Sequence, residues 1–355
     1  MVPPMLRRVL GSDELRASRL PQLKSSKVYR NGLVQRLLGS SPVAAHLLED
    51  CYRLVLTRVL RPEARTEHGD LEARLATFAS RFPEALEDDE EDQPVFLLAA
   101  GWRSGSTLLQ RVLMSSQDLM IWGEPFARSG LATSLASQLR AFTSEWPKAE
   151  YFVSSFEDDL SSQWVANSYP DATQLLAAHR AFFRKLLAEP ARALGRRRWG
   201  FKEVRLDGSH ARYLKLLFPR AKFVFLVRDP YACYASFRHY IKSDFHAWPE
   251  RPVHSAGDFG RLWQQLASDL ERVCPLVDGF WLRYEDYLSD PRQHEKLCAY
   301  LDADLMPPQS LKLIPSHGQV GTTNSARPAN QLLWWERRSL RREAGALASR
   351  LGYAG

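Results

Sequence analysis

The feature that most constrains the fold is the run from Val95 to Leu113, in which an apolar segment, a Gly/Ser-rich turn and an amphipathic segment follow one another. The run predicts a buried strand over Val95–Ala100 and a helix over Ser106–Ser115. Backbone N–H groups of such a turn have no partner within the helix, and the helix dipole favours negative charge there. Arg103 adds a forked cation that suits phosphate or sulfate oxygens. The turn therefore predicts a site for a phosphorylated ligand, with further donors from the hydroxyl groups of Ser104, Ser106 and Thr107.

Two well-known phosphate loops do not fit this turn. The nucleotide-triphosphatase loop requires a Lys-Ser or Lys-Thr pair after its last glycine, and neither Gly101 nor Gly105 is followed by one. The dinucleotide-binding pattern G-x-G-x-x-G does not fit either. An ordinary strand-to-helix connection, whose serines only cap the helix, stays open as an alternative.

A second apolar run, Lys222–Val227, also ends in a charged turn. Pro230 stands where a helix would begin, and Asp229 is placed to cap that helix. Ser236 then lies about two turns along the helix, and Arg228 lies at the end of the strand. An Arg–Asp pair that merely closes the turn is the structural alternative.

Together the two segments resemble the nucleotide loops of sulfotransferases that use 3′-phosphoadenosine 5′-phosphosulfate (PAPS). The sequence Arg103-Ser-Gly-Ser-Thr-Leu-Leu109 resembles their 5′-phosphosulfate loop, and Arg228-Asp-Pro with Ser236 resembles their 3′-phosphate element. The motifs are nearest to the tyrosylprotein, carbohydrate and bacterial branches of the superfamily, over about residues 93–330. The resemblance implies a P-loop-like fold and PAPS as the sulfuryl donor. It assigns the nucleotide contacts to Arg103, Ser104, Gly105, Ser106, Thr107, Leu108, Arg228, Ser236 and Tyr284.

The resemblance also indicates which residues carry the chemistry. Within Trp122-Gly-Glu-Pro-Phe126, Glu124 takes the place of the catalytic glutamate, the base that receives the proton of the acceptor. Within Trp199–Arg205, Lys202 takes the place of the lysine that stabilises the departing phosphate, and Arg103 is the second cation. A glutamate before proline is held extended, and its aromatic neighbours are expected to shield it from water.

Simpler roles stay open for both groups. Glu124 would then brace its own loop, and Lys202 would pair with Glu203. Glu203 and Arg205 are otherwise interpreted as orienting neighbours of Lys202 or as substrate contacts.

Histidine is the rival for the base, because aryl and steroid sulfotransferases use one. The candidates are His210 and His239, but neither stands in a matching context. His294 and Cys298 are four residues apart, which makes a poor zinc site on a single helix. The sequence therefore predicts a reaction that requires no metal.

Four apolar runs predict the strands of a parallel sheet: Val95–Ala100, Trp199–Val204, Lys222–Val227 and Gly279–Tyr284. The helices expected between them are Ser106–Ser115, Ala172–Ala188, Arg212–Leu217, Tyr231–Ile241 and Phe259–Val273. Because strands and helices alternate, the fold class is a doubly wound α/β fold with helices on both faces of the sheet. Ligands of such folds bind beyond the carboxyl ends of the strands. The side chains expected to meet there are Arg103, Lys202, Arg228 and Glu285.

Residues 1–92 predict a helical N-terminal extension. Ser41-Pro42 is a favourable helix start, a second helix is expected over about residues 70–82, and the acidic run Glu87–Asp92 predicts a solvated linker. The sulfotransferase domain is expected to span residues 93–355. Since the extension matches no motif, a lid, a substrate platform and a homodimer contact all remain open as its role.

Composition favours an enzyme of the cytoplasm. Four scattered cysteines predict free thiols in a reducing compartment: Cys51, Cys233, Cys274 and Cys298. No apolar run approaches the roughly twenty residues that span a bilayer, and the N-terminal residues lack the apolar core of a signal peptide. The net charge of +7 suits a protein that holds a polyanionic nucleotide.

The predicted reaction moves a sulfuryl group from PAPS to a hydroxyl of a glycan, lipid or small molecule, with no nucleic-acid partner. The polar loop over residues 318–328 matches, loosely, a family loop that closes over the nucleotide. A magnesium-dependent phosphotransferase and a non-catalytic nucleotide- or nucleic-acid-binding protein are the rival functions. The aromatic candidates for the acceptor pocket are Trp146, Tyr151, Phe152 and Trp164.

Overall fold

The computed structural model describes residues 65–87, 92–125, 130–153, 161, 165–237, 253, 255–311 and 332–353. The chain divides into two compact units, residues 1–69 and 70–355. Of the first unit only the backbone of residues 65–69 is described, as the start of helix α6 (Arg65–Arg81). The helix predicted at Ser41-Pro42 and the acidic residues 88–91 lie outside the described residues.

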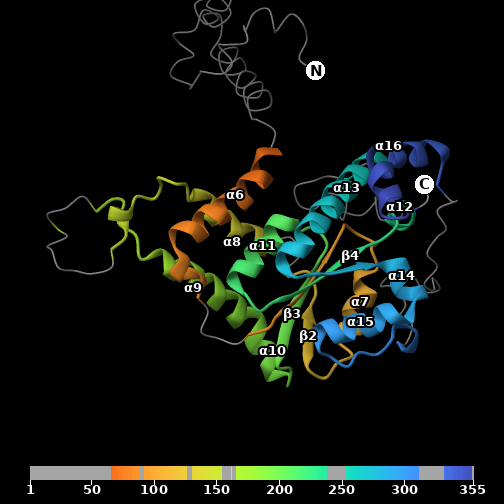
Figure 1. Cartoon of the computed structure of the whole chain (residues 1–355), viewed down its shortest axis with the longest axis horizontal. Helices are drawn as coiled ribbons and strands as arrows, with labels where there is room; N and C mark the ends of the chain where they lie inside the picture. The colour runs from red at the N-terminus through yellow and green to blue at the C-terminus, as the bar shows by residue number, and fades with distance from the viewer. Residues whose placement is uncertain are drawn as a thin grey trace, which may run out of the picture. The chain divides into compact units, whose positions relative to one another are not determined.

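A five-stranded parallel sheet forms the centre of the second unit, in the order β2-β3-β1-β4-β5 (Figure 1). Every residue of the central strand β1 is buried, as a strand covered on both faces requires. Phe96 of β1 lies in register with Phe201 on one side and Phe223 on the other, and their rings contact one another in the core. The strands are β1 (Val95–Ala99), β2 (Leu119–Trp122), β3 (Arg198–Glu203), β4 (Lys222–Val227) and β5 (Phe280–Arg283).

Helices cover both faces of this sheet. Figure 1 shows α11 and α13 on one face and α7 and α15 on the other. The α-helices after α6 are α7 (Ser106–Leu113), α8 (Leu131–Gln138), α9 (Ala172–Phe183), α10 (Glu189–Ala193), α11 (Gly208–Leu217), α12 (Pro230–Phe237), α13 (Ala256–Val273), α14 (Tyr284–Ser289), α15 (Pro291–Leu301) and α16 (Trp334–Arg350). Shorter helical turns are η1 (Pro83–Leu86), η3 (Leu139–Ala141), η4 (Ala149–Tyr151), η6 (Arg184–Ala188), η9 (Cys274–Val277) and η10 (Pro308–Ser310). Among the helices of the described residues, none is both long enough and apolar enough to cross a membrane.

The chain reverses its winding direction between two neighbouring strands, β1 and β4. From β1 the chain passes through α7 to β2 at one edge of the sheet, whereas from β4 it passes through α12 and α13 to β5 at the other edge. The loops after β1 and β4 therefore leave to opposite sides, which opens a crevice beyond their carboxyl ends. These are the two loops that carry Arg103 and Arg228.

The α/β fold and its parallel sheet are confirmed, with differences at the edges. The strand over Lys222–Val227 has the predicted bounds, and the other three predicted strands differ by one residue at one or both ends. Strand β2 was not predicted, because its apolar run between Asp118 and Gly123 is only four residues long.

Helix ends differ from the predicted ones where a capping residue lies further upstream. Helix α11 starts four residues before the predicted Arg212, because Asp207 accepts a hydrogen bond from the backbone N–H of His210. In the same way Ser255 caps α13, which starts three residues before Phe259. The helix predicted over Ala172–Ala188 continues as α9, the π-helical turn η6 and α10. Residues 238–241 of the predicted fourth helix lie outside the described residues.

Helix α6 contributes to the core of the second unit. Leu71, Leu75 and Phe78 are buried in the same hydrophobic cluster as the strands. Asp92, the last residue of the predicted acidic linker, is largely buried and pairs with Arg184 at 2.9 Å and with Arg192 at 2.8 Å. The start of the sheet domain is therefore anchored to η6 and α10 rather than solvated.

Candidate active site

The loops after β1 and β4 contact each other directly. Arg228 donates a hydrogen bond from Nη1 to the backbone oxygen of Arg103, at 2.9 Å. Arg103 in turn donates from Nε to Oγ of Ser236 on α12, also at 2.9 Å. Trp263 of α13 donates its indole N–H to the backbone oxygen of Arg228, which anchors the turn after β4 to α13. The structure thus brings together three predicted nucleotide contacts, of which Arg103 lies more than a hundred residues before Arg228 and Ser236 in the sequence.

Gly105 is the position in the first loop that admits no side chain. Its φ of +88° lies in the left-handed region, and a Cβ built there would come within 2.2 Å of Cε2 of Tyr284. The guanidinium of Arg228 lies on the same ring, with Cζ 4.5 Å from the ring centroid. Tyr284, which follows β5, therefore contacts both loops and completes the set of predicted nucleotide contacts at this edge of the sheet.

The start of α7 is available to an anion. Its N-cap is Gly105, and no side chain among the described residues caps the helix, so the serines do not cap it as the structural alternative required. Ser104 is fully buried, and its Oγ has no hydrogen-bond partner among the described residues. Nε of Arg228 is also buried without a partner in this part of the chain. Because a hydroxyl and a guanidinium N–H are donors, both are able to bind a ligand that accepts hydrogen bonds.

A second polar cluster joins the loop after β2 to the end of β3. Oε1 of Glu124 lies 2.6 Å from Nζ of Lys202, and its Oε2 lies 3.1 Å from Nη2 of Arg205. Trp122 of β2 lies in register with Phe201 of β3, which places Glu124 beside Lys202. The carboxylate of Glu124 is therefore held by two cations.

Arg205 connects this carboxylate to a neighbouring one. It donates from Nε and Nη2 to the two carboxylate oxygens of Glu203, at 3.0 and 2.9 Å. Glu203 also accepts the backbone N–H of Val204, at 2.8 Å. Lys202 thus pairs with Glu124 rather than with Glu203, contrary to the simpler alternative for this lysine. Of the two aromatic residues expected to shield Glu124, Trp122 donates its indole N–H to the backbone oxygen of Leu187. The other, Phe126, lies outside the described residues.

Two carboxyl groups brace the turn that carries Arg228. Asp229 caps α12, as predicted, by accepting the backbone N–H of Tyr231 at 2.8 Å. Glu285 accepts the backbone N–H of Asp229 at 3.1 Å, which brings the end of β5 to the same edge of the sheet. Burial raises the pKa of both carboxyl groups above their ordinary values. Their hydrogen bonds indicate a structural role in holding the turn.

The described histidines have structural partners. His210 is buried, and its Nδ1 lies 2.7 Å from Oδ1 of Asp207, within the cap of α11. His294 contacts the hydroxyl of Tyr287 and the backbone oxygen of Leu305, each at 3.0 Å. His239 lies outside the described residues. In the described part of the chain, no group of three or more His, Cys, Asp or Glu residues could hold a metal ion.

The described aromatic candidates for an acceptor pocket lie near the C-terminal end of α6. Trp146 and Tyr151 have ring centroids 5.4 Å apart, and Phe152 packs on Phe82 just after α6 at 5.3 Å. Arg81 of α6 binds the backbone oxygen of Trp146 at 2.8 Å. Trp164 and residues 318–328 lie outside the described residues. The lining of the acceptor pocket stays a prediction.

Sequence reasoning missed one contributor to the site and underrated another. Trp263 was not singled out, although a tryptophan on the apolar side of a strongly amphipathic segment signals burial against the sheet. Arg205 was expected beside Lys202 but binds Glu124. The contact between Arg205 and Glu124 depends on the pairing of β2 with β3, which no sequence motif predicts.

The chain is similar in sequence to known proteins. Residues 94–307, more than half of the chain, match a family model described as "Sulfotransferase family". An omega-hydroxy-beta-dihydromenaquinone-9 sulfotransferase of Mycobacterium bovis is 24% identical over 303 residues, which cover 74% of this chain and 76% of that protein; the same enzyme of Mycobacterium tuberculosis gives the same values. Among solved structures, the sulfotransferase domain of the Synechococcus PCC 7002 olefin synthase is 23% identical, with a TM-score of 0.43, over 76% of this chain and 98% of that one. The sulfotransferase domain of the curacin biosynthetic pathway is 17% identical, with a TM-score of 0.42, over 75% and 99%. The matched family region contains both loops, Glu124 and Lys202.

Proposed function

This chain belongs to the sulfotransferase family, and we propose that it transfers the sulfuryl group of PAPS to a hydroxyl group. The observation that carries the proposal is the direct contact between the loops of Arg103 and Arg228 at the reversal point of the sheet. Two cationic loops that meet at one crevice suit a ligand with two separate phosphate groups.

The donor nucleotide would bind along this crevice. The 5′-phosphosulfate would lie on the N-terminus of α7, against Arg103 and the residues from Ser104 to Leu108. The 3′-phosphate would bind Arg228 and Ser236, and Tyr284 would contact the nucleoside. The unpartnered Oγ of Ser104 and Nε of Arg228 fit this assignment, because both are donors and phosphate oxygens are acceptors.

The transfer needs a base, stabilisation of the leaving phosphate, and alignment of the two reactants. Glu124 would accept the proton of the acceptor hydroxyl as the new S–O bond forms. The bond between sulfur and the bridging phosphate oxygen breaks at the same time, and the electron pair stays on the phosphate. Lys202 and Arg103 would stabilise the negative charge that develops there.

Arg205 would act as a positioning residue for this base. It binds Glu124 and Glu203 at once, so it holds the Glu124 carboxylate when Lys202 turns toward the leaving phosphate. The ion pair between Lys202 and Glu124, at 2.6 Å, would exist before the reactants bind. Glu124 would then keep one cationic partner throughout the reaction.

Among hydroxyl acceptors, we place lipids first. The mycobacterial relatives are named for a hydroxylated menaquinone, which is a lipid. Glycans and small phenols remain the other acceptor classes to test.

The experiment is transfer of radiolabelled sulfate from PAPS to a panel of hydroxylated lipids, glycans and phenols, with wild type and Glu124→Gln. The proposal predicts labelled product with wild type, turnover that persists without added magnesium, and its loss in the variant. Label transfer that requires magnesium, or phosphate transfer from a nucleoside triphosphate, would instead identify a phosphotransferase. Nucleotide binding without any transfer would identify a binding protein.

We further propose residues 93–355 as the catalytic domain and residues 1–92 as its N-terminal extension, for which a homodimer contact is one role to test. A location in the cytoplasm is proposed because the described cysteines are free thiols: Cys233, Cys274 and Cys298. Fractionation of cells that express the tagged full chain tests the location, and sedimentation of the purified chain tests the dimer.

A further inference from the structure

The outer face of α16 exposes tryptophans in a way that the transfer reaction does not require. Trp334 is 70% exposed and Trp335 is 51% exposed, and Leu333 before them is 47% exposed. Other exposed large hydrophobic residues of the described chain are scattered singly, which is normal for a protein surface. Three consecutive ones indicate a surface that is covered by something else.

The opposite face of α16 accounts for how the helix is held. Its buried residues are Leu340, Ala344, Leu347 and Ala348, which pack against α13 and α12. Gly260 of α13 allows close approach, since a Cβ there would lie 3.0 Å from the side chain of Glu343. The helix is therefore fixed on its inner side, and its tryptophans belong to the outer side.

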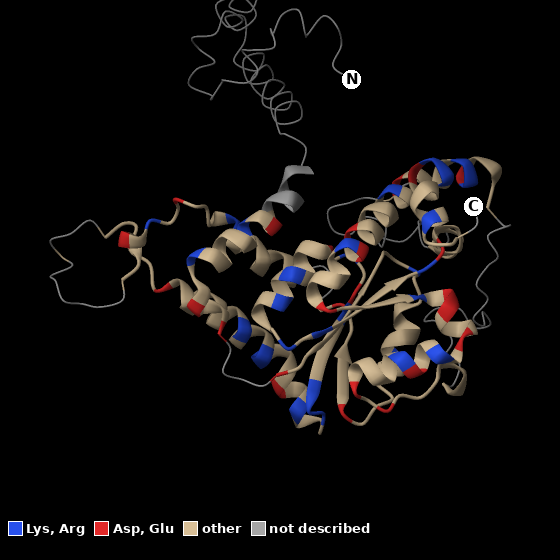
Figure 2. Ribbon diagram, viewed as in Figure 1, with Lys and Arg blue, Asp and Glu red and all other residues tan. Residues whose placement is uncertain are grey.

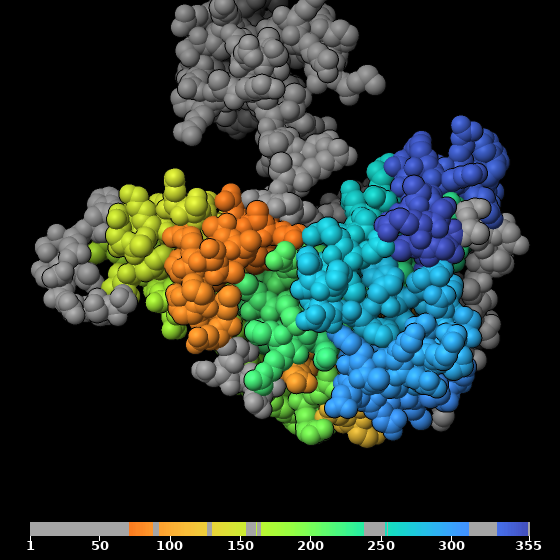
Figure 3. Space-filling view, in the orientation of Figure 1, coloured from red at the N-terminus to blue at the C-terminus, as the bar shows by residue number. Residues whose placement is uncertain are grey.

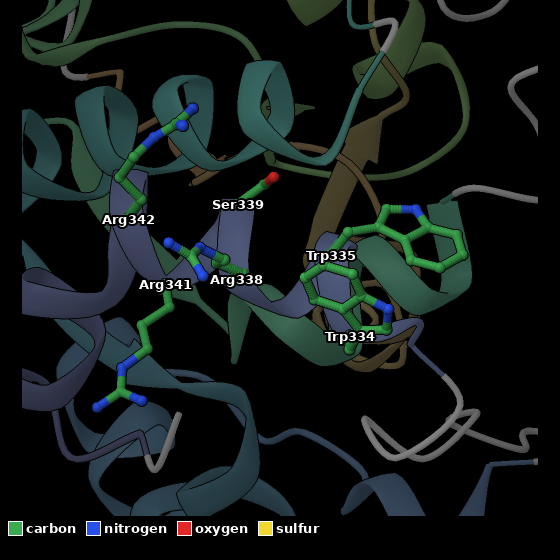
Figure 4. A pocket seen from close by; sticks show the side chains of 6 residues that line it. All are labelled: Trp334, Trp335, Arg338, Ser339, Arg341 and Arg342. Carbon is green, nitrogen blue, oxygen red and sulfur yellow. The ribbon is translucent and has the colours of Figure 1, made fainter.

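Arginines share the outer side with the tryptophans. A surface hollow of about 600 Å³ is lined by Trp334, Trp335, Arg338, Ser339, Arg341 and Arg342, which we call the Trp/Arg patch. Figure 4 shows the two indoles at one end of the patch and the arginine side chains spread along the helix from them. Figure 2 shows α16 as a helix rich in basic residues, and in Figure 3 it lies on the visible surface beside α13.

Two of the three arginines of the patch have no carboxylate partner within the described residues. Helix α16 contains five arginines and two glutamates. Glu336 accepts the backbone N–H of Leu333, and Glu343 pairs with Arg342 and with Arg261 of α13. Neither Arg338 nor Arg341 has a carboxylate partner in the described part of the chain. The patch therefore offers both apolar aromatic surface and uncompensated positive charge.

We propose that the Trp/Arg patch docks the enzyme on the surface of an anionic lipid bilayer. Tryptophan prefers the boundary between headgroups and hydrocarbon, where its ring is buried and its N–H stays in the polar layer. Arginine side chains next to it bind anionic headgroups. The indole rings of Trp334 and Trp335 are nearly perpendicular, with centroids 5.8 Å apart, and each side chain is more than half exposed. Exposed aromatic area flanked by cations suits the headgroup layer of an anionic bilayer.

The patch is connected to the reaction site. Arg341 and Tyr231 line a common hollow of about 290 Å³ at the contact of α16 with α12. Tyr231 follows the turn of Arg228 and Asp229 directly. Docking through α16 would therefore hold the crevice between the two loops near the bilayer. The docking surface is independent of which acceptor the enzyme uses.

The test is flotation of the full-length protein with vesicles of phosphatidylcholine alone, or with about 30 mol% phosphatidylglycerol, an anionic lipid. Wild type should float with the anionic vesicles and remain largely in solution with the neutral ones. Trp334→Ala/Trp335→Ala should weaken binding about tenfold, because it removes the buried aromatic area. Arg338→Gln and Arg341→Gln should each weaken it about fivefold and reduce its dependence on salt.

Matched controls separate the patch from general surface properties. Phe182→Ala, an exposed aromatic residue of α9, and Arg292→Gln, an exposed arginine of α15, should bind vesicles like wild type. Turnover with a water-soluble acceptor should be unchanged in all patch variants, so that a failure of docking is distinguished from a failure of catalysis. Wild type that stays in solution with anionic vesicles, or patch variants that bind as tightly as wild type, would overturn the proposal. A wild type that self-associates while the tryptophan variant stays monomeric would also overturn it, and would identify the patch as a protein interface.

Discussion

Nζ of Lys202 lies 2.6 Å from Oε1 of Glu124, across two strands that no sequence motif links. The proposed base and the cation proposed for the leaving phosphate are thus ion-paired with each other. Arg205, 3.1 Å from Oε2, is the cation that would keep the carboxylate in place during transfer.

Removal of the base should abolish turnover and spare nucleotide binding. Glu124→Gln keeps the size of the side chain but cannot accept the acceptor proton, so kcat should fall by about 10² to 10⁴. Affinity for adenosine 3′,5′-bisphosphate should change little, because its phosphates are assigned to the other loops. Single-turnover kinetics and calorimetric titration measure the two quantities. Glu295→Gln, an exposed glutamate of α15, is the control and should retain full activity.

Substitution of Arg205 should act on the rate rather than on the donor. Arg205→Gln breaks the bridge between Glu124 and Glu203, and kcat should fall about tenfold, with unchanged KM for PAPS. Arg205→Lys should recover part of the loss, because it restores the charge without the fork. Arg197→Gln, which removes an exposed ion pair with Asp118, should have no effect. An equal loss of kcat in the lysine and glutamine variants would argue against the positioning role.

Gly105 should tolerate no side chain at all. Gly105→Ala places a Cβ against Tyr284 and puts an alanine at a φ of +88°, which is strained for a residue with a side chain. The KM for the donor should therefore rise more than about tenfold. Gly195→Ala is the matched control, since its φ is +76° but nothing lies within 4 Å of the added Cβ. Both variants should lose about 1 kcal/mol of stability from the backbone, and only the first should lose nucleotide affinity. Urea unfolding and steady-state kinetics separate these effects.

The buried carboxyl of Glu285 predicts a pH-dependent stability. Burial raises its pKa in the folded state, so the folded protein binds this proton more readily than the unfolded chain does. Wild type should therefore lose stability, relative to Glu285→Gln, as the pH rises above about 4.3, the value of an unfolded glutamate. Below that pH the relative stability of the two proteins should stop changing.

Thermal unfolding of both proteins from pH 4 to pH 8 gives this difference directly. Glu150→Gln, an exposed glutamate, should show no such trend. A difference between wild type and Glu285→Gln that is the same at every pH would contradict the assignment of a burial-raised pKa.

The sequence was sufficient for the parts of the fold that depend on continuous patterns. Strands β1, β3, β4 and β5 were predicted because each overlaps a six-residue run that is rich in apolar residues. Strand β2 was not, because its apolar run between Asp118 and Gly123 is only four residues long. The contact of Glu124 with Lys202 and Arg205 depends on where β2 lies in the sheet, and so it required the structure.

The loops after β1 and β4 also combine features that the sequence predicts with contacts that only the structure shows. The glycines and the arginine of the first turn, and the Arg-Asp-Pro of the second, were recognisable because each has a local physical role. Ser236 was expected to share a phosphate with Arg228, but its observed hydrogen bond is to Arg103. This contact depends on the tertiary approach of α12 to the first loop. The ring of Tyr284 against Gly105 likewise brings together residues that are far apart in the sequence.

The most direct test of the account compares two nucleotides on one pair of proteins. Calorimetric titration of wild type and Arg228→Gln with adenosine 3′,5′-bisphosphate and with adenosine 5′-monophosphate isolates the contribution of the 3′-phosphate. We predict that the variant loses about ten- to a hundredfold in affinity for the bisphosphate and much less for the monophosphate, because a charged hydrogen bond to the 3′-phosphate is removed. Equal losses for both nucleotides, or no loss for either, would contradict the claim that the loops of Arg103 and Arg228 hold the two ends of one doubly phosphorylated adenosine.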